Sequence, residues 1–359
     1  MRAGTWPATG RQIQKVASYV LRSMFDVRYM SYVCRSYVRY TFYVLRSTFY
    51  VESKTSNVER RTSDVGVSGT PKMAPRLLSY IELTKPRITF LIVLTAAASF
   101  CLGSEGPLNY IQFFHTIFGI TLLSSGIATL NQFLERESDG LMLRTRCRPL
   151  PAGKLAPKTA LLFGVILTAL ALIYLALFIN LLTAILGVIA FTGYLFLYTP
   201  LKTRTTLCTF IGAFPGAMPA LMGWAAARGQ LSIEGWVLFA ILFLWQFPHF
   251  FSIAWLYRED YARAGIRMLP VVESEGRVTG QQIVIYTLLL LPVSLLPTLL
   301  KLSGSIYFYG ALALGIAFIY YGIRVAILRS KWQARRLLQA SVLYLPLLFA
   351  LMVLNQGGK

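Results

Sequence analysis

Nine apolar segments follow one another from Ile88 towards the C-terminus, each close to the roughly 20 residues that an α-helix needs to cross a bilayer. Charged residues are rare inside these segments and gather between them. Because a chain in lipid must satisfy its backbone hydrogen bonds internally, this series predicts an all-α polytopic membrane protein, a bundle of nine transmembrane helices. The predicted spans are 88–104, 111–133, 159–178, 181–199, 207–227, 235–256, 281–300, 306–327 and 337–355.

The composition agrees with this class. Hydrophobic residues make up 56% of the 359 residues and charged residues only 14%, which is more apolar than a soluble domain. The formal net charge is +21, but the basic residues stand in short loops. This charge therefore favours anionic lipid or an anionic substrate, and we expect no nucleic-acid partner. The cysteines form no CxxC pair and no metal-ligand spacing; they are Cys34, Cys101, Cys147 and Cys208.

The loops alternate in charge along the chain. Every second loop is basic, starting after the second predicted span, whereas the opposite loops carry only Arg228 and Lys301. By the positive-inside rule, the N-terminus and the basic loops are cytoplasmic and the C-terminus lies outside. A bacterial inner membrane is favoured, and a mitochondrial inner membrane is the alternative if the N-terminal segment is a transit peptide. The basic loop residues are Arg144, Arg146, Arg148, Lys154, Lys158, Lys202, Arg204, Arg258, Arg263, Arg267, Arg277, Arg329, Lys331, Arg335 and Arg336.

Residues 1–75 differ from the rest of the chain. They contain near-repeats of aromatic residues, Val, Arg and Ser, followed by a polar stretch. Three interpretations stay open: a targeting segment, a disordered or loosely membrane-associated arm, and a segment upstream of a true start at Met73. We therefore expect a basic, repeat-like N-terminal extension over residues 1–75 and a membrane domain over residues 76–359 that carries the function.

Three oxygen-bearing side chains end the second predicted span. Asn131, Glu135 and Asp139 are spaced i, i+4, i+8, so on an α-helix they share one face along roughly 12 Å, while Glu137 points elsewhere. Gly140 is the expected helix end. An ionised carboxylate at this depth in the membrane costs free energy unless it pairs with a cation or a hydrogen-bond donor. Mg²⁺ is commonly held by one or two carboxylates together with substrate phosphates, so this face is a candidate Mg²⁺ and diphosphate site.

Further charged groups are predicted at the same end of the bundle. Carboxylates there can hold a metal ion that bridges to phosphate oxygens, while Arg and Lys neutralise the remaining phosphate charge. The residues are Lys202 and Arg204 after the fourth span, and Tyr257, Arg258, Glu259 and Asp260 after the sixth.

A diphosphate beneath an apolar bundle suggests a leaving group. Its departure needs stabilisation of the developing charge, and an allylic fragment leaves as a carbocation that a dry, aromatic chamber shields from water. The pattern therefore favours a prenyl donor whose tail lies between the helices. One alternative is a transporter, although its acids would mark an ion path through the membrane. The other is an interfacial salt-bridge cluster, with Arg136, Arg144, Arg146 and Arg148 as partners of the acids.

Four stretches together resemble one family. They are "NQFLERESDGLMLRTRCRPLPAG", "YTPLKTRTTLCTFIGAFPGAMPALMGW", "WQFPHFFSIAWLYREDYARAGIRMLPVV" and "YIELTKPRITFLIVLTAAASF". Over about residues 76–355 the chain resembles the UbiA-type intramembrane prenyltransferases, and more narrowly their heme-farnesylating branch. The resemblance implies a nine-helix bundle with a cavity open towards the membrane. It also implies Mg²⁺-dependent transfer of a farnesyl group from farnesyl diphosphate to a vinyl group of heme b, with addition of water, to give heme O.

The resemblance also implies roles for individual residues. Asn131, Glu135 and Asp139 match the first acidic motif and Asp260 the second, which makes these four the expected catalytic and metal-binding residues. In the second motif Glu259 and Asp260 are adjacent, in place of the two spaced aspartates of quinone-pathway relatives, and Arg267 stands where proline is more usual. The expected diphosphate-binding residues are Arg144, Arg148, Lys202, Arg204, Tyr257 and Arg258.

His249, in "WQFPHFF", is the expected heme-binding residue. A neutral imidazole can ligate iron, and His249 precedes Tyr257 and Asp260 by eight and eleven residues, about 12 to 16 Å deeper along a helix. The alternative is a hydrogen-bonded core histidine, and His115 is expected to be structural or interfacial. The alternative acceptor is an aromatic ring of quinone biosynthesis. Expected partners besides the substrates are membrane lipid and heme A synthase or terminal-oxidase assembly factors.

Overall fold

The computed structural model describes residues 73–356. Within this range the chain is helical, with no strand beyond an isolated bridge between Ser303 and Gln356. Nine of the described helical segments are long and apolar enough to cross a membrane. The predicted fold class and number of spans are therefore confirmed, and the protein is an integral membrane protein. The interpretations of residues 1–72, and Cys34 with them, lie outside the described residues.

Eight of these nine spans are single helices, and the fourth is composite. The single helices are α4 (Pro86–Gly103), α5 (Tyr110–Leu134), α7 (Pro157–Phe178), α10 (Cys208–Arg228), α11 (Ile233–Leu256), α14 (Arg277–Leu299), α15 (Ser305–Leu328) and α16 (Lys331–Leu354). The fourth span consists of α8 (Leu181–Thr192), a π-helical segment η1 (Gly193–Tyr198) and α9 (Thr199–Leu201). Four short helices complete the described range: α3 (Met73–Leu83), α6 (Arg136–Leu141), α12 (Arg258–Arg263) and α13 (Leu269–Val272).

The predicted span limits are close to the observed ones but miss the charged ends of helices. The last span begins at Lys331 instead of residue 337, because the basic turn that contains Arg335 and Arg336 is helical. Hydropathy marks where a chain becomes apolar, whereas the helix begins at its cap, here Ser330, whose side chain accepts a hydrogen bond from the Gln333 backbone.

The second span and α6 form an almost continuous helical path that bends at Glu135. Glu135 has φ −93° and ψ 7°, but its N–H still donates to the Asn131 carbonyl at 2.9 Å, and the Asp139 N–H donates to the Glu135 carbonyl at 2.7 Å. The i, i+4 relationship of the three residues therefore survives the bend. Gly140 is not the helix end: it lacks the positive φ of a glycine cap, and α6 ends at Leu141.

Glycine permits close approach of helices, as two examples show. A Cβ on Gly126 of α5 would lie 2.3 Å from Thr168 Oγ1 on α7, and one on Gly223 of α10 would lie 2.1 Å from the Ala96 carbonyl oxygen on α4. Small residues of this kind bring backbones together in membrane bundles, where apolar side chains gain little from leaving lipid.

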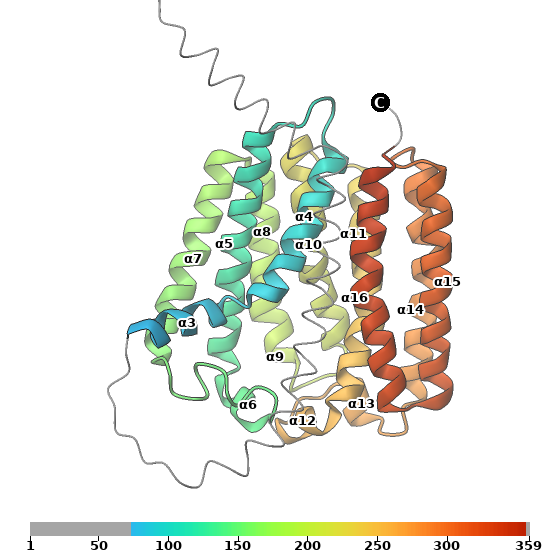
Figure 1. Ribbon diagram of the computed structural model, residues 1–359. Coiled ribbons are helices and arrows are strands. Elements are labelled where there is room, and N and C mark those ends of the chain that lie inside the picture. Colours follow the sequence, from blue (N-terminus) through green and yellow to red (C-terminus); the bar gives the residue numbers. More distant parts are fainter. Residues whose placement is uncertain (1–72, 357–359) are drawn as a thin grey trace, which may run out of the picture. The chain divides into compact units, whose positions relative to one another are not determined.

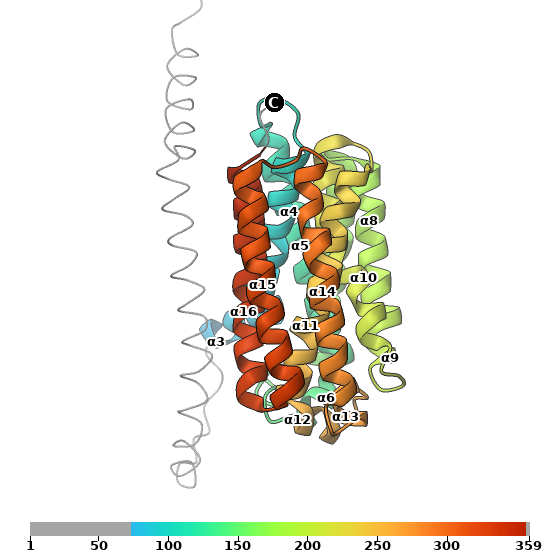
Figure 2. The ribbon, with the colours of Figure 1, turned by 90° about the vertical axis from the view of Figure 1, so that its right-hand side faces the viewer.

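The basic loops lie together at one end of the bundle. In both views α6, α12 and α13 cap the same end, α3 lies at the side of the bundle nearer to that end, and α16 runs from there to the opposite end (Figures 1 and 2). This confirms that the basic loops share one face. Which side of the membrane this face meets stays a prediction.

Candidate functional site

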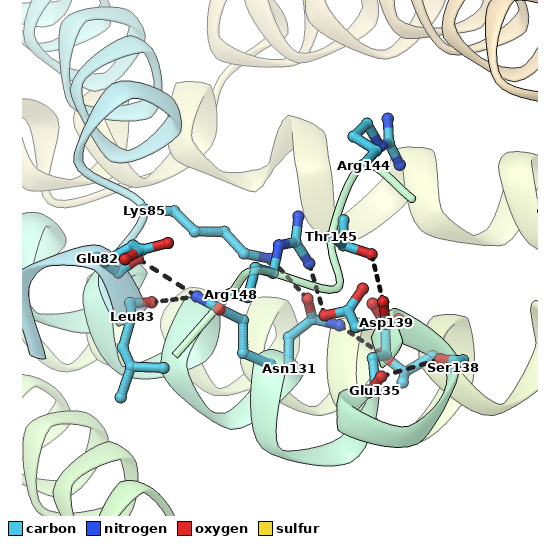
Figure 3. A network of polar contacts seen from close by, with 12 residues as sticks. Glu82, Leu83, Lys85, Asn131, Glu135, Ser138, Asp139, Arg144, Thr145 and Arg148 are labelled. Atoms are coloured by element: carbon cyan, nitrogen blue, oxygen red, sulfur yellow. Dashed lines mark hydrogen bonds and ion pairs between the residues drawn. The ribbon is translucent and has the colours of Figure 1, made fainter. Parts of the chain in front are cut away.

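Asn131 and Glu135 each contact a lysine from a distant part of the chain. The Lys85 Nζ donates to Asn131 Oδ1 at 2.8 Å (Figure 3), and the Lys202 Nζ donates to Glu135 Oε1 at 2.5 Å. Asn131 is 1% exposed, and the side chains of Glu135 and Lys202 are each 13% exposed. Burial alone would raise the pKa of Glu135, but Lys202 and Lys85 hold it below its usual value. Burial likewise opposes the charge of Lys202, yet Glu135 raises its pKa well above the usual value.

Lys85 was not predicted as a site residue. It precedes Pro86 at the start of α4 with φ 47°, in the left-handed region that favours glycine. Gln132 of α5 supports the preceding turn by donating to the Leu83 carbonyl at 2.9 Å. Burial, followed by repulsion from Arg148, lowers the pKa of Lys85 to about 7. The sequence feature that could have indicated it is the pair Lys85 and Arg87 around Pro86, where the first span begins.

Asp139 is the most deeply buried carboxylate of this group, at 1% exposure. Arg148 donates to its Oδ2 at 2.7 Å, and the Thr145 hydroxyl donates to its backbone carbonyl at 2.8 Å (Figure 3). Its Oδ1 is buried and accepts no hydrogen bond in the described structure. Since an unsatisfied buried carboxylate oxygen is costly, this atom suits a bound cation.

The residues therefore fit a metal that is held only partly by protein. Asp139 Oδ1 lies one helical turn beyond Glu135, and both are hard oxygen donors of the kind that Mg²⁺ takes. No three His, Cys, Asp or Glu side chains in the described range are grouped closely enough to hold an ion by themselves. Such a donor set matches Mg²⁺ that completes its coordination with substrate phosphate oxygens and water.

Asp260 secures the loop that follows the first acidic motif. It is 7% exposed, accepts hydrogen bonds from the backbone N–H groups of Leu143 at 3.2 Å and Arg144 at 3.4 Å, and pairs with Arg263. The two acidic motifs therefore meet through this loop, and the metal-binding role of Asp260 stays a prediction. Glu259 is half exposed and bonds to Lys331 at 2.9 Å; this hydrogen bond lowers its pKa.

Only some of the six predicted diphosphate-binding residues lie beside the acids. Arg148 and Lys202 lie beside the acids, as described above. The Arg144 side chain instead stacks over the ring of Tyr257 at 4.5 Å and donates to the Tyr261 hydroxyl at 3.2 Å. Arg204 is exposed in the loop after α9, and Arg258 is turned towards the Ser274 carbonyl, 3.2 Å away.

The interfacial salt-bridge cluster, the alternative to a metal site, is observed only in part. Arg148 pairs with Asp139, as this alternative expects. Arg136 instead pairs with Glu137, whose side chain is 85% exposed and points away, as predicted. We name Asn131, Glu135, Asp139, Lys85, Arg148 and Lys202 the charged layer.

An apolar cavity of about 330 Å³ adjoins the charged layer. Lys85 of that layer and Tyr198 of η1 belong to its wall, which continues along α5 to Ile120. Ile120 precedes Glu135 by fifteen residues, so this part of the cavity wall lies about 22 Å from Glu135 along the helix axis. Its other lining residues are mainly apolar, and most of them come from α4, α10, α11 and α16.

His249 lines the same cavity. Its Nδ1 lies 2.8 Å from the Ser341 hydroxyl of α16, and its ring stacks on Trp245 with 4.7 Å between centroids. His249 is thus both hydrogen-bonded, as a core histidine would be, and part of the cavity wall. His115 lies near the start of α5, 2.5 Å from the Tyr174 hydroxyl and stacked on Phe178, which agrees with a structural role.

Comparison with known proteins gives consistent matches over the membrane part of the chain. Residues 92–352 match the model of the UbiA prenyltransferase family. A protein named protoheme IX farnesyltransferase from Solibacter usitatus is 54% identical over 78% of this chain and 99% of its own length. One of the same name from Koribacter versatilis is 50% identical over 80% of this chain and 96% of its own length.

Solved structures share the fold at low identity. The structure of a digeranylgeranylglyceryl phosphate synthase superposes with a TM-score of 0.66 at 20% identity, over 78% of this chain and 98% of that one. A UbiA homologue from Archaeoglobus fulgidus bound to GPP and Mg²⁺ gives 0.56 at 16% identity, over 76% of this chain and 99% of that one.

Proposed function

The chain belongs to the UbiA prenyltransferase family, and we propose that it transfers the farnesyl group of farnesyl diphosphate to heme b to form heme O. The relatives that are 54% and 50% identical carry the name protoheme IX farnesyltransferase. Their matches cover nearly their whole lengths, so the same activity is expected here.

The observation that carries the proposal is the junction of the charged layer with the apolar cavity. Lys85 belongs to both, so a molecule with an anionic head and an apolar tail can place each part in a matching environment. The tail is shielded from water by apolar side chains, and the head meets partly buried lysine and arginine groups. A prenyl diphosphate has this form.

At the charged end, we assign the diphosphate to Arg148 and Lys202, with Lys85 added as a third cation. Asn131, Glu135 and Asp139 would hold Mg²⁺, and the resemblance adds Asp260. When bound, Mg²⁺ neutralises charge that develops on the departing diphosphate. Lysine and arginine act on the same charge, so the C–O bond breaks with its electron pair on the diphosphate.

At the apolar end, the farnesyl carbon joins the terminal carbon of a heme vinyl group. The positive charge then lies on the vinyl carbon beside the porphyrin, where a water oxygen adds and a proton is released. His249 lies eight residues before Tyr257, about 12 Å deeper than the end of α11. We assign His249 to the iron of the heme substrate, because a neutral imidazole in the cavity wall is suited to that role.

Production of heme O in membranes tests the proposed activity. The protein is expressed in a host that lacks this activity, and hemes are extracted and weighed by mass spectrometry. The expected product is heavier than heme b by one farnesyl group plus water. Farnesylated hydroxybenzoate, with heme unchanged, would instead show the aromatic-ring activity of quinone biosynthesis, and neither product would refute both assignments.

Two substitutions separate the two substrate sites. His249→Ala is expected to weaken heme binding and leave farnesyl diphosphate binding nearly unchanged. Lys202→Ala is expected to do the reverse, because its ammonium lies in the charged layer. Both affinities are measured on each purified variant. Loss of farnesyl diphosphate binding in His249→Ala with normal heme affinity would contradict the assignment.

We place the enzyme in a bacterial inner membrane, with the charged layer facing the cytoplasm. The basic loops share that face, which agrees with the positive-inside rule. Farnesyl diphosphate would then enter from the cytoplasmic side, and heme O would pass to heme A synthase or to a terminal-oxidase assembly factor.

A further inference from the structure

Two residues of α11 hold the same residue of α16. The Trp245 indole N–H donates to the Ser341 backbone carbonyl at 2.9 Å, and His249 Nδ1 lies 2.8 Å from the Ser341 hydroxyl oxygen. Trp245 and His249 are one helical turn apart and stacked on each other. Ser341 is 0% exposed, while its neighbour Val342 lines the cavity. Ser341 therefore lies behind the imidazole, between it and the backbone of α16.

The hydroxyl of Ser341 has a single proton, and its geometry shows where that proton goes. The Ser341 Oγ lies 2.7 Å from the Leu338 carbonyl oxygen. Two oxygen atoms at this distance repel each other unless a proton lies between them. Ser341 therefore donates to Leu338, and its oxygen is left to accept from His249. The nitrogen of His249 that carries the proton is then Nδ1.

We propose that Ser341 is a positioning residue that fixes His249 as the Nδ1–H tautomer and leaves Nε2 as the bare nitrogen. A ring nitrogen binds iron only through an unprotonated lone pair, and a hydrogen bond at the other nitrogen sets the tautomer and the ring orientation. This inference rests on the proposed function for its purpose, namely presenting Nε2 to heme iron. The tautomer itself can be measured without any substrate.

The tautomer is directly observable, because the chain contains only two histidines, His115 and His249. A His115→Gln protein labelled with ¹⁵N-histidine gives the signals of His249 alone. We expect the proton on Nδ1 in heme-free protein and a shift of the proton towards Nε2 in Ser341→Ala. A proton on Nε2 in the parent protein overturns the proposal, as does an unchanged Nδ1–H signal in Ser341→Ala. The parent measurement stands even if Ser341→Ala fails to fold.

A matched control separates positioning from packing. Ser294 is also 0% exposed and also joins two helices, through a 2.9 Å hydrogen bond with the Tyr344 hydroxyl. Ser294→Ala therefore removes a comparable buried bond without touching His249. We expect it to leave both the tautomer and heme affinity within about twofold of the parent. A Ser294→Ala protein that changes the His249 signals as Ser341→Ala does would show a general packing effect and overturn the proposal.

Heme and iron-free protoporphyrin IX provide the second readout. Loss of an outer hydrogen bond to a metal-binding histidine typically weakens metal affinity by about 10–100-fold. We expect Ser341→Ala to lose roughly that much affinity for heme and almost none for protoporphyrin, and Ser341→Thr to restore heme binding. Equal loss for both porphyrins would assign Ser341 to packing. A parent protein that binds heme through His249 yet makes no heme O would refute the proposed function and leave the inference about Ser341 standing.

Discussion

The Glu135–Lys202 pair offers a quantitative test of the charged layer. Both side chains are 13% exposed and 2.5 Å apart. Removing one partner of a buried pair costs about 3–5 kcal/mol, and the remaining exposure favours the lower end, about 3 kcal/mol. At roughly 2–4 °C per kcal/mol, either Glu135→Gln or Lys202→Met should lower the unfolding temperature by about 6–12 °C.

The double variant distinguishes charge pairing from simple loss of contacts. Removing both charges should restore the unfolding temperature to within about 3 °C of the parent, since a paired charge and a neutral pair are often similar in stability. Methionine also keeps contact with the Tyr198 ring, over which the Lys202 ammonium lies at 4.4 Å. Thermal unfolding is followed by tryptophan fluorescence in detergent without metal or diphosphate. The exposed Glu137→Gln change is the control and should have little effect. A double variant as unstable as the worse single variant would refute the reasoning.

Three further outcomes are expected. Asp139→Asn should abolish heme O formation at normal protein levels, because it removes the negative charge of the carboxylate whose Oδ1 is unsatisfied. Full activity of this variant at saturating Mg²⁺ would contradict the metal site. The pKa of Lys85 near 7 means that its ammonium is present below pH 7 and lost above it. The kcat/KM for farnesyl diphosphate should therefore fall as pH rises from about 7 to 8.5, and Lys85→Arg should flatten this fall; identical pH profiles would reject the role of Lys85. Deletion of residues 1–72 should leave activity intact, measured as heme O per correctly inserted protein.

The fold could be predicted from the sequence because lipid restricts the possible structures. Apolar segments of the required length must be helices, and their number and approximate limits follow from hydropathy alone. The π-helical turn of η1 could not be predicted in this way. This segment packs against α10, where a Cβ on Gly212 would lie 2.5 Å from the Tyr198 ring. Such contacts are absent from any pattern along the chain.

The charged layer could be predicted in part. The common face of Asn131, Glu135 and Asp139 follows from helical periodicity, which acts over a few residues. Their cations come from further away: Lys202 is 67 residues from Glu135, and Lys85 is 46 residues from Asn131. Which helices bring them together is decided by packing across the bundle, and no sequence spacing encodes it. The exposed position of Arg204 is likewise decided by packing and not by sequence spacing.

With the diphosphate-binding role proposed above, Lys85 is a position at which selection for function and selection for stability would oppose each other. Its φ of 47° suits glycine or asparagine, so a lysine there costs the folded protein about 1 kcal/mol or more of backbone strain. Burial of its ammonium is a further cost. A search for heat-resistant variants would therefore favour the loss of this lysine, and the most stable proteins recovered from it would be impaired enzymes.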